Sequence, residues 1–416
     1  MTRHYYFARE LARQGHDVTV FAGSHPHNSD VQLINDGSLY KVWQETPFRW
    51  IYVKTLKYGH NRIKEILSMF VYYRNSIRTA TRLLKEEDAP DVILGSSPHP
   101  LAALFAVRWG KKHHCKSIVE IRDLWPESIV ALGIAKAHNP AVLLLRRLEK
   151  YLYTHADAVV FTMEGAYDYI VEQGWEKDVP REKVHYINNG VDLEVFAHNK
   201  AHYTADDPDL DDPDTFKVVY TGSIRLANGL KLLLDCAEKL KPYPDIRILI
   251  YGGGSDLETL RQLCRERGIT NCLFKGPVPK QSVPYVLSKS DLTLLNYDLQ
   301  AVRLYQYGSS QNKLFEYLAA GKPVLSNTPI SHSVVKKYRC GADELLSDAD
   351  TYAAAILRFY RMTDAEREAL CANARRAAED YDFRKLTQKL VQAVGEIPEK
   401  EQEKAGKEMD LSYAIH

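Results

Sequence analysis

Short apolar strands alternate with amphipathic helices along nearly the whole chain, and this alternation constrains the fold more than any other feature. One series ends near residue 187, and a second runs from residue 216 to about residue 326. Alternation of this kind is typical of parallel sheets that carry helices on both faces. Because 416 residues are about twice a usual domain, the sequence predicts two doubly wound α/β domains.

The expected elements follow from β-branched runs and from helical periodicity. A helix begins at once and ends before Gly15, with the apolar stripe Tyr5, Phe7, Ala8, Leu11 and Ala12. The first series has expected strands at 16–22, 91–95, 117–121, 158–161 and 184–187, with helices at 62–86, 99–114, 139–154 and up to 173. The second has strands at 216–222, 246–252, 272–276, 291–295 and 323–326, with helices at 229–241, 255–268, 281–288 and 312–320 and closing helices at 350–359, 364–380 and 383–395.

The alternation stops where prolines and aspartates replace apolar residues, which is typical of a linker between domains. The predicted division is therefore an N-terminal domain over 1–197, an acidic linker over 198–215, a C-terminal domain over 216–380, a helix at 381–398 packed back on the first domain, and a polar tail over 399–416.

Composition excludes some classes of protein. With 55 Lys and Arg against 54 Asp and Glu, the net charge of +1 argues against a dedicated nucleic-acid binder. The six cysteines form no C-x-x-C pair, and the sequence contains neither a signal peptide nor a run of 18 apolar residues. These features favour a cytosolic protein with reduced thiols.

The segment Tyr307–Leu325 has the pattern of a phosphate site. A helix that opens near Asn312 presents unpaired backbone N–H groups and the positive end of its dipole. Lys313 would then supply a cation for a diphosphate, and Glu316 a carboxylate for ribose hydroxyls, on neighbouring turns. The alternative is an ordinary surface pair between Lys313 and Glu316.

Five segments resemble, in order, the family-4 retaining glycosyltransferases: residues 3–20, 120–128, 187–196, 220–230 and 312–325. The nearest subgroup is formed by bacterial surface-polysaccharide transferases that resemble N-acetylfucosamine transferases. The resemblance implies a GT-B fold, in which two Rossmann-like domains face a cleft. It also implies a further strand and a glycine-rich turn before the helix that begins at Met1, so the N-terminal domain is expected to lack its first strand.

The resemblance assigns donor-binding residues in the C-terminal domain. Glu316 matches the second glutamate of the family's E-x7-E motif, which binds ribose, whereas the first position is Gly308. Ser223 and Asn228 stand where relatives have Arg and Lys, so Arg225 and Lys313 are the expected diphosphate cations. The implied donor set is Gly222, Ser223, Asn228, Gly229, Gly253, Val278, Asn312, Leu314 and Glu316.

In the N-terminal domain, Asp123 stands where many relatives have a histidine that contacts the donor sugar. Its carboxylate would stabilise oxocarbenium-like charge, which makes Asp123, Arg225 and Lys313 the predicted catalytic set. The predicted acceptor set is Asn61, His99, Arg122 and Trp125. Two structural alternatives remain: an Arg122–Asp123 ion pair with Trp125 in the core, and a helix-capping turn at His99.

No metal or other cofactor is expected, because in such retaining transfer the leaving diphosphate helps to deprotonate the acceptor. Asp207 and Asp209 imitate a D-x-D metal motif, but they lie in the acidic linker.

Basic and aromatic residues interleave around the helix predicted at 62–86. This favours docking on an anionic membrane, consistent with a lipid-linked saccharide acceptor and with the inner face of the plasma membrane. The alternative is a solvated helix face. The basic residues are Arg49, Lys54, Lys57, Arg62, Lys64, Arg74, Arg78, Arg82 and Lys85.

The sequence thus predicts a retaining glycosyltransferase that moves a sugar, expected to be an N-acetylated hexosamine or deoxyhexosamine, from a UDP-sugar to that acceptor. Two alternatives stay open at this point. They are a nucleotide-sugar 2-epimerase of the same architecture and a GT-B protein that binds nucleotide without turnover.

Overall fold

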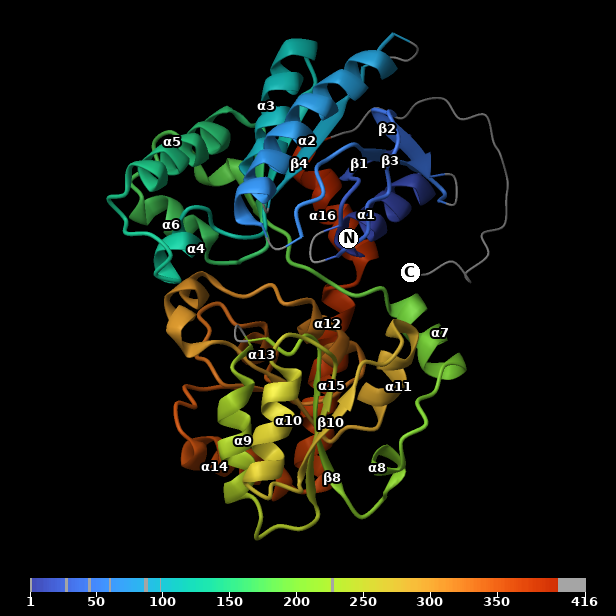
Figure 1. Ribbon diagram of the computed structural model, residues 1–416, viewed down its shortest axis with the longest axis vertical. Coiled ribbons are helices and arrows are strands. Elements are labelled where there is room, and N and C mark those ends of the chain that lie inside the picture. The colour runs from blue at the N-terminus through green and yellow to red at the C-terminus, as the bar shows by residue number, and fades with distance from the viewer. Residues whose placement is uncertain are drawn as a thin grey trace. The chain divides into compact units, whose positions relative to one another are not determined.

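The computed structural model describes residues 2–26, 29–43, 46–59, 61–85, 89–97, 99–225 and 228–395. These residues form two compact units (Figure 1). The first unit combines residues 2–188 with residues 383–395, and the second contains residues 189–382. The predicted polar tail over 399–416 lies outside the described residues. Within the described part, no helix is both long and apolar enough to span a bilayer.

The strands of the first unit form two separate sheets. In the smaller sheet, β1 (Thr19–Gly23) pairs in parallel with β3 (Arg49–Val53), which pairs antiparallel with β2 (Tyr40–Trp43). The larger sheet is parallel, in the order β4 (Val92–Ser96), β5 (Lys116–Ile121), β6 (Ala158–Phe161) and β7 (Val184–Tyr186). No described strand joins β1 to β4. The prediction that the first strand is lacking stays a prediction, whereas β2 and β3 were not predicted at all.

Helix α1 (Thr2–Arg13) connects the two sheets through a buried charge. It packs on β1, and its Arg3 guanidinium lies 2.7 Å from the Glu120 carboxylate of β5 and donates to the Ile187 carbonyl at 2.8 Å. Glu120 also bonds to His4 at 2.9 Å. Burial opposes ionisation, yet Arg3 and His4 hold the pKa of Glu120 well below its usual range. The buried face of α1 therefore carries an arginine as well as the predicted apolar residues Phe7 and Ala8, whereas Tyr5, Leu11 and Ala12 are only half-buried.

The last helix among the described residues, α16 (Phe383–Val394), belongs to the first unit. It packs on α1 and β6, and Figure 1 shows it beside α1. The Phe383 ring stacks on Tyr6 at 4.9 Å, and Lys116 Nζ donates to the Val394 carbonyl at 2.8 Å. The other helices of this unit are α2 (Arg62–Leu83), α3 (Pro100–His113), α4 (Glu127–Ala131), α5 (Pro140–His155) and α6 (Ala166–Glu172), with a 3-10 turn at Arg181–Lys183.

The second unit has one parallel sheet in the order β10-β9-β8-β11-β12-β13. Its strands are β8 (Phe216–Thr221), β9 (Ile246–Tyr251), β10 (Cys272–Gly276), β11 (Leu292–Leu295), β12 (Val324–Ser326) and β13 (Gly341–Asp343). Strands β8 and β11 are buried at every position, as expected when helices cover both faces of a sheet. The helices are α7 (Leu193–His202), α8 (Pro208–Asp211), α9 (Leu230–Lys239), α10 (Leu257–Glu266), α11 (Val283–Ser288), α12 (Asn312–Ala319), α13 (Val334–Tyr338), α14 (Ala349–Tyr360) and α15 (Asp364–Asp380), with 3-10 turns at Lys280–Ser282 and Leu299–Tyr307.

The predicted acidic linker over 198–215 is wrong. These residues include the end of α7 and all of α8, they belong to the second unit, and the unit boundary falls at Asn188 rather than at residue 197. Lys275 Nζ neutralises Asp207 at 2.6 Å and also bonds Asp209, while Tyr251 donates to Asp207 at 2.7 Å. The aspartates therefore anchor this segment to the sheet.

Candidate functional site

The loops after β8 and β9 meet backbone to backbone at the carboxyl edge of the second sheet. Gly222 N donates to the Tyr251 carbonyl at 2.9 Å. A Cβ on Gly252 would lie 1.8 Å from Gly222 O, and a Cβ on Gly254 would lie 2.2 Å from Ile224 O. Both positions also have φ values that favour glycine, 148° and 158°. Residues 222–224 and 252–254, which we call the glycine platform, therefore expose backbone where ligands bind in open parallel sheets.

The Lys313 amine lies at the edge of the glycine platform. Its Nζ donates to the Tyr220 hydroxyl at 2.7 Å and lies 4.2 Å from the centroid of that ring. The Tyr220 hydroxyl in turn donates to the Ser223 carbonyl at 2.8 Å. A Cβ on Gly222 would lie 2.9 Å from Nζ, so the missing side chain at that position makes room for the amine.

Lys313 is a poorly solvated cation beside the N-terminus of α12. Desolvation lowers the pKa of its amine to about 7, and Glu316 only partly opposes the shift. No carboxylate forms an ion pair with it in the described part of the chain. The first N–H groups of α12 add positive electrostatic potential, because Gln311 at the N-cap provides no side-chain cap. An anion bound here would keep Lys313 charged, and its most suitable chemistry is that of a phosphate.

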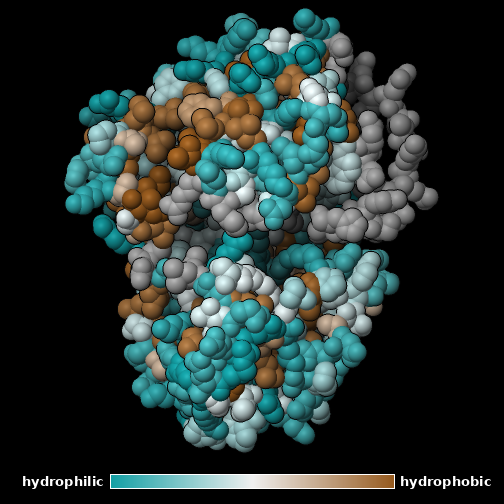
Figure 2. Space-filling model, in the orientation of Figure 1, coloured by the Kyte–Doolittle hydropathy of each residue, from teal (hydrophilic) through white to brown (hydrophobic). Residues whose placement is uncertain are grey.

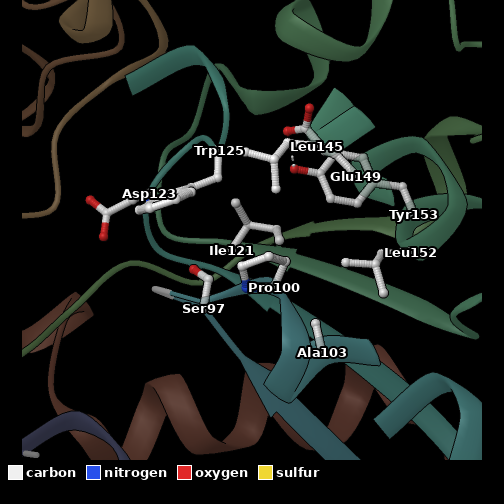
Figure 3. Close-up of a pocket in the computed structure, with 10 residues that line it drawn as sticks. All are labelled: Ser97, Pro100, Ala103, Ile121, Asp123, Trp125, Leu145, Glu149, Leu152 and Tyr153. Atoms are coloured by element: carbon white, nitrogen blue, oxygen red, sulfur yellow. Dashed lines mark hydrogen bonds between the residues drawn. The ribbon is translucent and has the colours of Figure 1, made fainter. Parts of the chain in front are cut away.

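In the first unit, the loop after β5 lines a small cavity (Figure 3). The cavity holds about 20 Å³, which suffices for about one water molecule and not for a sugar ring. Asp123 is exposed, and its carboxylate points away from the apolar lining, while Glu149 and Tyr153 close another side. The lining residues are Ser97, Pro100, Ala103, Ile121, Asp123, Trp125, Leu145, Glu149, Leu152 and Tyr153.

Glu149 of α5 is a buried carboxyl group that sequence reasoning missed. The hydroxyls of Tyr153 and Tyr169 each donate to it at 2.8 Å. Burial raises the pKa of Glu149 to about 8, although both tyrosines and Arg146 oppose the shift. The carboxyl group is therefore mostly protonated at neutral pH.

Both units match models of glycosyltransferase domains. Residues 2–195 match Glycosyltransferase Family 4, and residues 204–377 match Glycosyl transferases group 1. The chain carries both of these glycosyltransferase domains and has the two-domain GT-B fold.

Named relatives of this glycosyltransferase come from bacterial polysaccharide synthesis. It is 28% identical over 38% of its length to a Bacillus subtilis (strain 168) protein named as a teichuronic acid biosynthesis glycosyltransferase, TuaH. It is 24% identical over 68% of its length to an Escherichia coli (strain K12) protein named as a colanic acid biosynthesis glycosyl transferase, WcaI. The matched stretches span 38% of TuaH and 70% of WcaI.

A solved structure carries the same fold. HepE of Anabaena, in complex with UDP-glucose, superimposes with a TM-score of 0.56 at 14% identity. The superposition covers 82% of this chain and 85% of HepE.

Glu316 of this glycosyltransferase pairs with Lys280 and not with Lys313. The alternative of a Lys313–Glu316 surface pair is therefore wrong. Lys280 follows β10 and was missed, because it lies 36 residues before Glu316 and no local pattern connects them. The missed Tyr317 hydroxyl accepts from Thr221 N at 3.1 Å, which fixes α12 to the end of β8.

The predicted donor residues after β8 have unequal roles. Asn228 Nδ2 donates to the Ser223 carbonyl at 2.8 Å and to Ser223 Oγ at 3.0 Å, closing the loop. A Cβ on Gly229 would lie 2.6 Å from the Tyr297 carbonyl, and its φ is 56°, so glycine is needed there. Arg225 is exposed, and its guanidinium has no ion-pair partner in the described ranges.

The remaining donor residues lie on the platform, after β10 and on α12. Gly253 has no atom within 4 Å of a Cβ placed on it, unlike its two neighbours. Val278 is half-buried, and Asn312 is exposed. Leu314 is 2% exposed, so only its backbone is available to a donor.

The predicted acceptor residues are not joined into one cluster by the contacts found. Asn61 caps α2 by accepting from Lys64 N at 3.0 Å. His99 occupies the N-cap position of α3 but forms no side-chain cap, so a side-chain cap does not explain it. Its ring packs on Tyr72 at 5.4 Å, and burial lowers the pKa of His99 to about 4.

The alternative of an Arg122–Asp123 ion pair is also wrong, since no such pair forms among the described residues. Arg122 N donates to Ser97 Oγ at 2.9 Å, whereas its buried Nε lacks a hydrogen-bond partner. Trp125 is half-buried at the cavity. The described residues contain no group of three His, Cys, Asp or Glu suited to a metal, and Asp207 and Asp209 are engaged by Lys275.

Proposed function

We propose that this GT-B glycosyltransferase transfers a sugar from a UDP-sugar to a lipid-linked saccharide in surface polysaccharide synthesis. The observation that carries the proposal is the position of Lys313, a partly desolvated cation between the glycine platform and the N-terminus of α12. The UDP-glucose held by HepE supports UDP as the nucleotide, and the names of WcaI and TuaH support the polysaccharide product.

The donor diphosphate binds along the glycine platform in this proposal. Lys313 and the first N–H groups of α12 neutralise its charge, and the absence of side chains lets its oxygens approach the backbone. Glu316 accepts from the ribose hydroxyls, with Lys280 orienting its carboxylate. Arg225 supplies a second cation from its exposed position.

The reaction proceeds with retention at the anomeric carbon. An acceptor hydroxyl attacks this carbon from the face that the diphosphate leaves, so a new carbon–oxygen bond forms as the bond to phosphate oxygen breaks. The hydroxyl proton passes to a diphosphate oxygen, and the bonding electrons remain on the leaving group. Lys313 stabilises that negative charge, and Asp123 stabilises the positive charge on the sugar. Since the chain's own cations carry this step, the proposal includes no metal.

The finer parts of the proposal rest on the resemblance. The transferred sugar is an N-acetylated hexosamine or deoxyhexosamine, and Asn61, His99, Arg122 and Trp125 contribute to acceptor binding. The glycosyltransferase works in the cytoplasm at the inner face of the plasma membrane, because its acceptor is anchored there.

The test combines nucleotide binding with product analysis. Calorimetry with UDP is expected to show binding that Lys313→Met weakens about 10- to 100-fold, because a charge-assisted hydrogen-bond partner is lost. Lys241→Met is the matched control. This exposed lysine precedes the amino end of β9, whereas the glycine platform lies at the carboxyl edge of the sheet. UDP-N-acetylhexosamines incubated with lipid-linked saccharides are expected to give a product of retained configuration. An inverted product, or a 2-epimerised sugar formed without acceptor, would contradict the proposal.

A further inference from the structure

Helix α2 turns large apolar side chains toward solvent. Ile63, Ile66, Leu67 and Phe70 are 73%, 55%, 50% and 57% exposed. Their spacing of three and four residues puts them on one stripe of the helix, and a stripe of this kind normally faces the core. In the described part of this unit, no element covers it.

A second exposed apolar group lies between α4 and the first turns of α5. It consists of Leu132, Ile134, Leu143 and Leu144, and the most exposed of these is Leu144 at 66%. Helix α3 packs against both α2 and α5. Its Arg108 donates to Tyr73 of α2 at 3.5 Å and also bonds Tyr151 of α5, so the three helices lie side by side. Figure 2 shows apolar side chains gathering over this part of the molecule. We call these eight residues the apolar face.

The stripe on α2 continues as a row of cations. Arg74 follows Phe70 by one turn, and Arg78 and Arg82 follow at four-residue steps. All three are exposed, and none forms an ion pair in the described part of the chain. Like charges four residues apart repel each other. With Lys54 they line a groove of about 520 Å³, which we call the cationic groove.

We propose that the apolar face and the cationic groove together dock the protein on an anionic phospholipid bilayer. The apolar face enters the boundary between headgroups and acyl chains, and the groove binds headgroup phosphates. A bilayer is the occupant because it offers both chemistries within one helix length, and because its phosphates relieve the repulsion along the arginine row. The inference rests on the proposed function only for the purpose of docking, because docking brings the enzyme to its lipid-linked acceptor.

The experiment measures co-sedimentation of the full chain with vesicles. Vesicles rich in phosphatidylglycerol are expected to bind it at least tenfold more tightly than phosphatidylcholine vesicles, with salt weakening the binding. Ile63→Ser with Phe70→Ser, and separately Arg78→Glu with Arg82→Glu, are each expected to reduce binding about tenfold. Because all four side chains are exposed, the unfolding transitions of these variants are expected to match the wild type.

Matched controls place the same changes elsewhere. Leu345→Ser removes an apolar side chain that is 55% exposed on the second unit, and Lys241→Glu with Arg265→Glu reverses two exposed cations there. Both controls are expected to bind vesicles like the wild type. Equal binding by controls and face variants would overturn the inference. So would absent vesicle binding, or a dimer that only the face variants lose, since a second copy would then be the occupant.

Two failures can be told apart. UDP calorimetry uses no membrane, and vesicle sedimentation uses no substrate. A protein that binds vesicles but transfers no sugar contradicts the proposed function alone. A protein that transfers sugar to a detergent-solubilised acceptor but ignores vesicles contradicts the docking surface alone.

Discussion

The two units organise the residues at the ends of their strands in different ways. In the second unit, the glycine platform, Tyr220 and Lys313 are joined by contacts that leave one cation facing an open backbone surface. In the first unit, the loop after β5 lines a cavity for about one water, and Glu149 beside it accepts hydrogen bonds from two tyrosines. A preformed polar surface suits a fixed chemical group such as a diphosphate, whereas the buried carboxyl groups of the first unit already have partners within the unit.

The largest expected effect concerns the close packing of the glycine platform. Gly252→Ala puts a Cβ 1.8 Å from Gly222 O, so we expect it to destabilise the second unit by about 3 kcal/mol or more in a urea titration. Gly253→Ala is the matched control, because no atom lies within 4 Å of its Cβ and its φ is not in the left-handed region. Similar losses of stability for both variants would show that the close backbone contact between Gly252 and Gly222 does not determine the structure of the platform.

The second prediction concerns Glu149 in the first unit. Its folded pKa of about 8 lies above the ordinary value of 4.5, so the folded state keeps a proton that the unfolded state releases. Stability is therefore expected to fall as pH rises from 4.5 to 8, by at most about 1.4 kcal/mol per pH unit. Glu149→Gln resembles the protonated carboxyl group and is expected to match the wild type near pH 5 but exceed it at pH 8. Parallel stability profiles would rule out a buried neutral carboxyl group.

The smallest effect concerns Lys313 and nucleotide binding. A bound diphosphate raises the pKa of the amine above its free value of about 7, so binding takes up a proton. UDP affinity is therefore expected to fall about tenfold between pH 7 and pH 9, as calorimetry would measure. Lys313→Met is expected to flatten this dependence. A wild-type affinity that stays constant over this pH range would show that Lys313 does not bind the diphosphate.

Sequence patterns predicted the parallel strands because their signal is local. Strands β8 and β11 are mostly apolar, and every residue in them is buried. The apolar pattern did not predict β2, because the residues of this strand are mostly exposed. It did not predict β3, because this strand begins with Arg49 and its sequence resembles a basic patch. It failed again at Asp207, whose partner Lys275 lies 68 residues away.

The candidate site was predicted in part for the same reason. Lys313 was predicted from its position at a helix start and Gly222 from the family resemblance, and the structure brings the two side by side. Tyr220 beneath the amine, Lys280 on Glu316, and the close approach at Gly252 and Gly254 were not found, because each depends on pairing between distant segments. No sequence pattern indicated Glu149, because the pKa of this carboxyl group depends on its burial and not on the spacing of residues along the chain.

The order of synthesis determines when α16 can join the first unit. Residues 189–382 are contiguous, so the second unit can fold as soon as they have left the ribosome. The first unit is completed later, because Phe383 of α16 stacks on Tyr6 of α1. The part made first is thus completed last, and until then its opening helix lacks the partner that covers it.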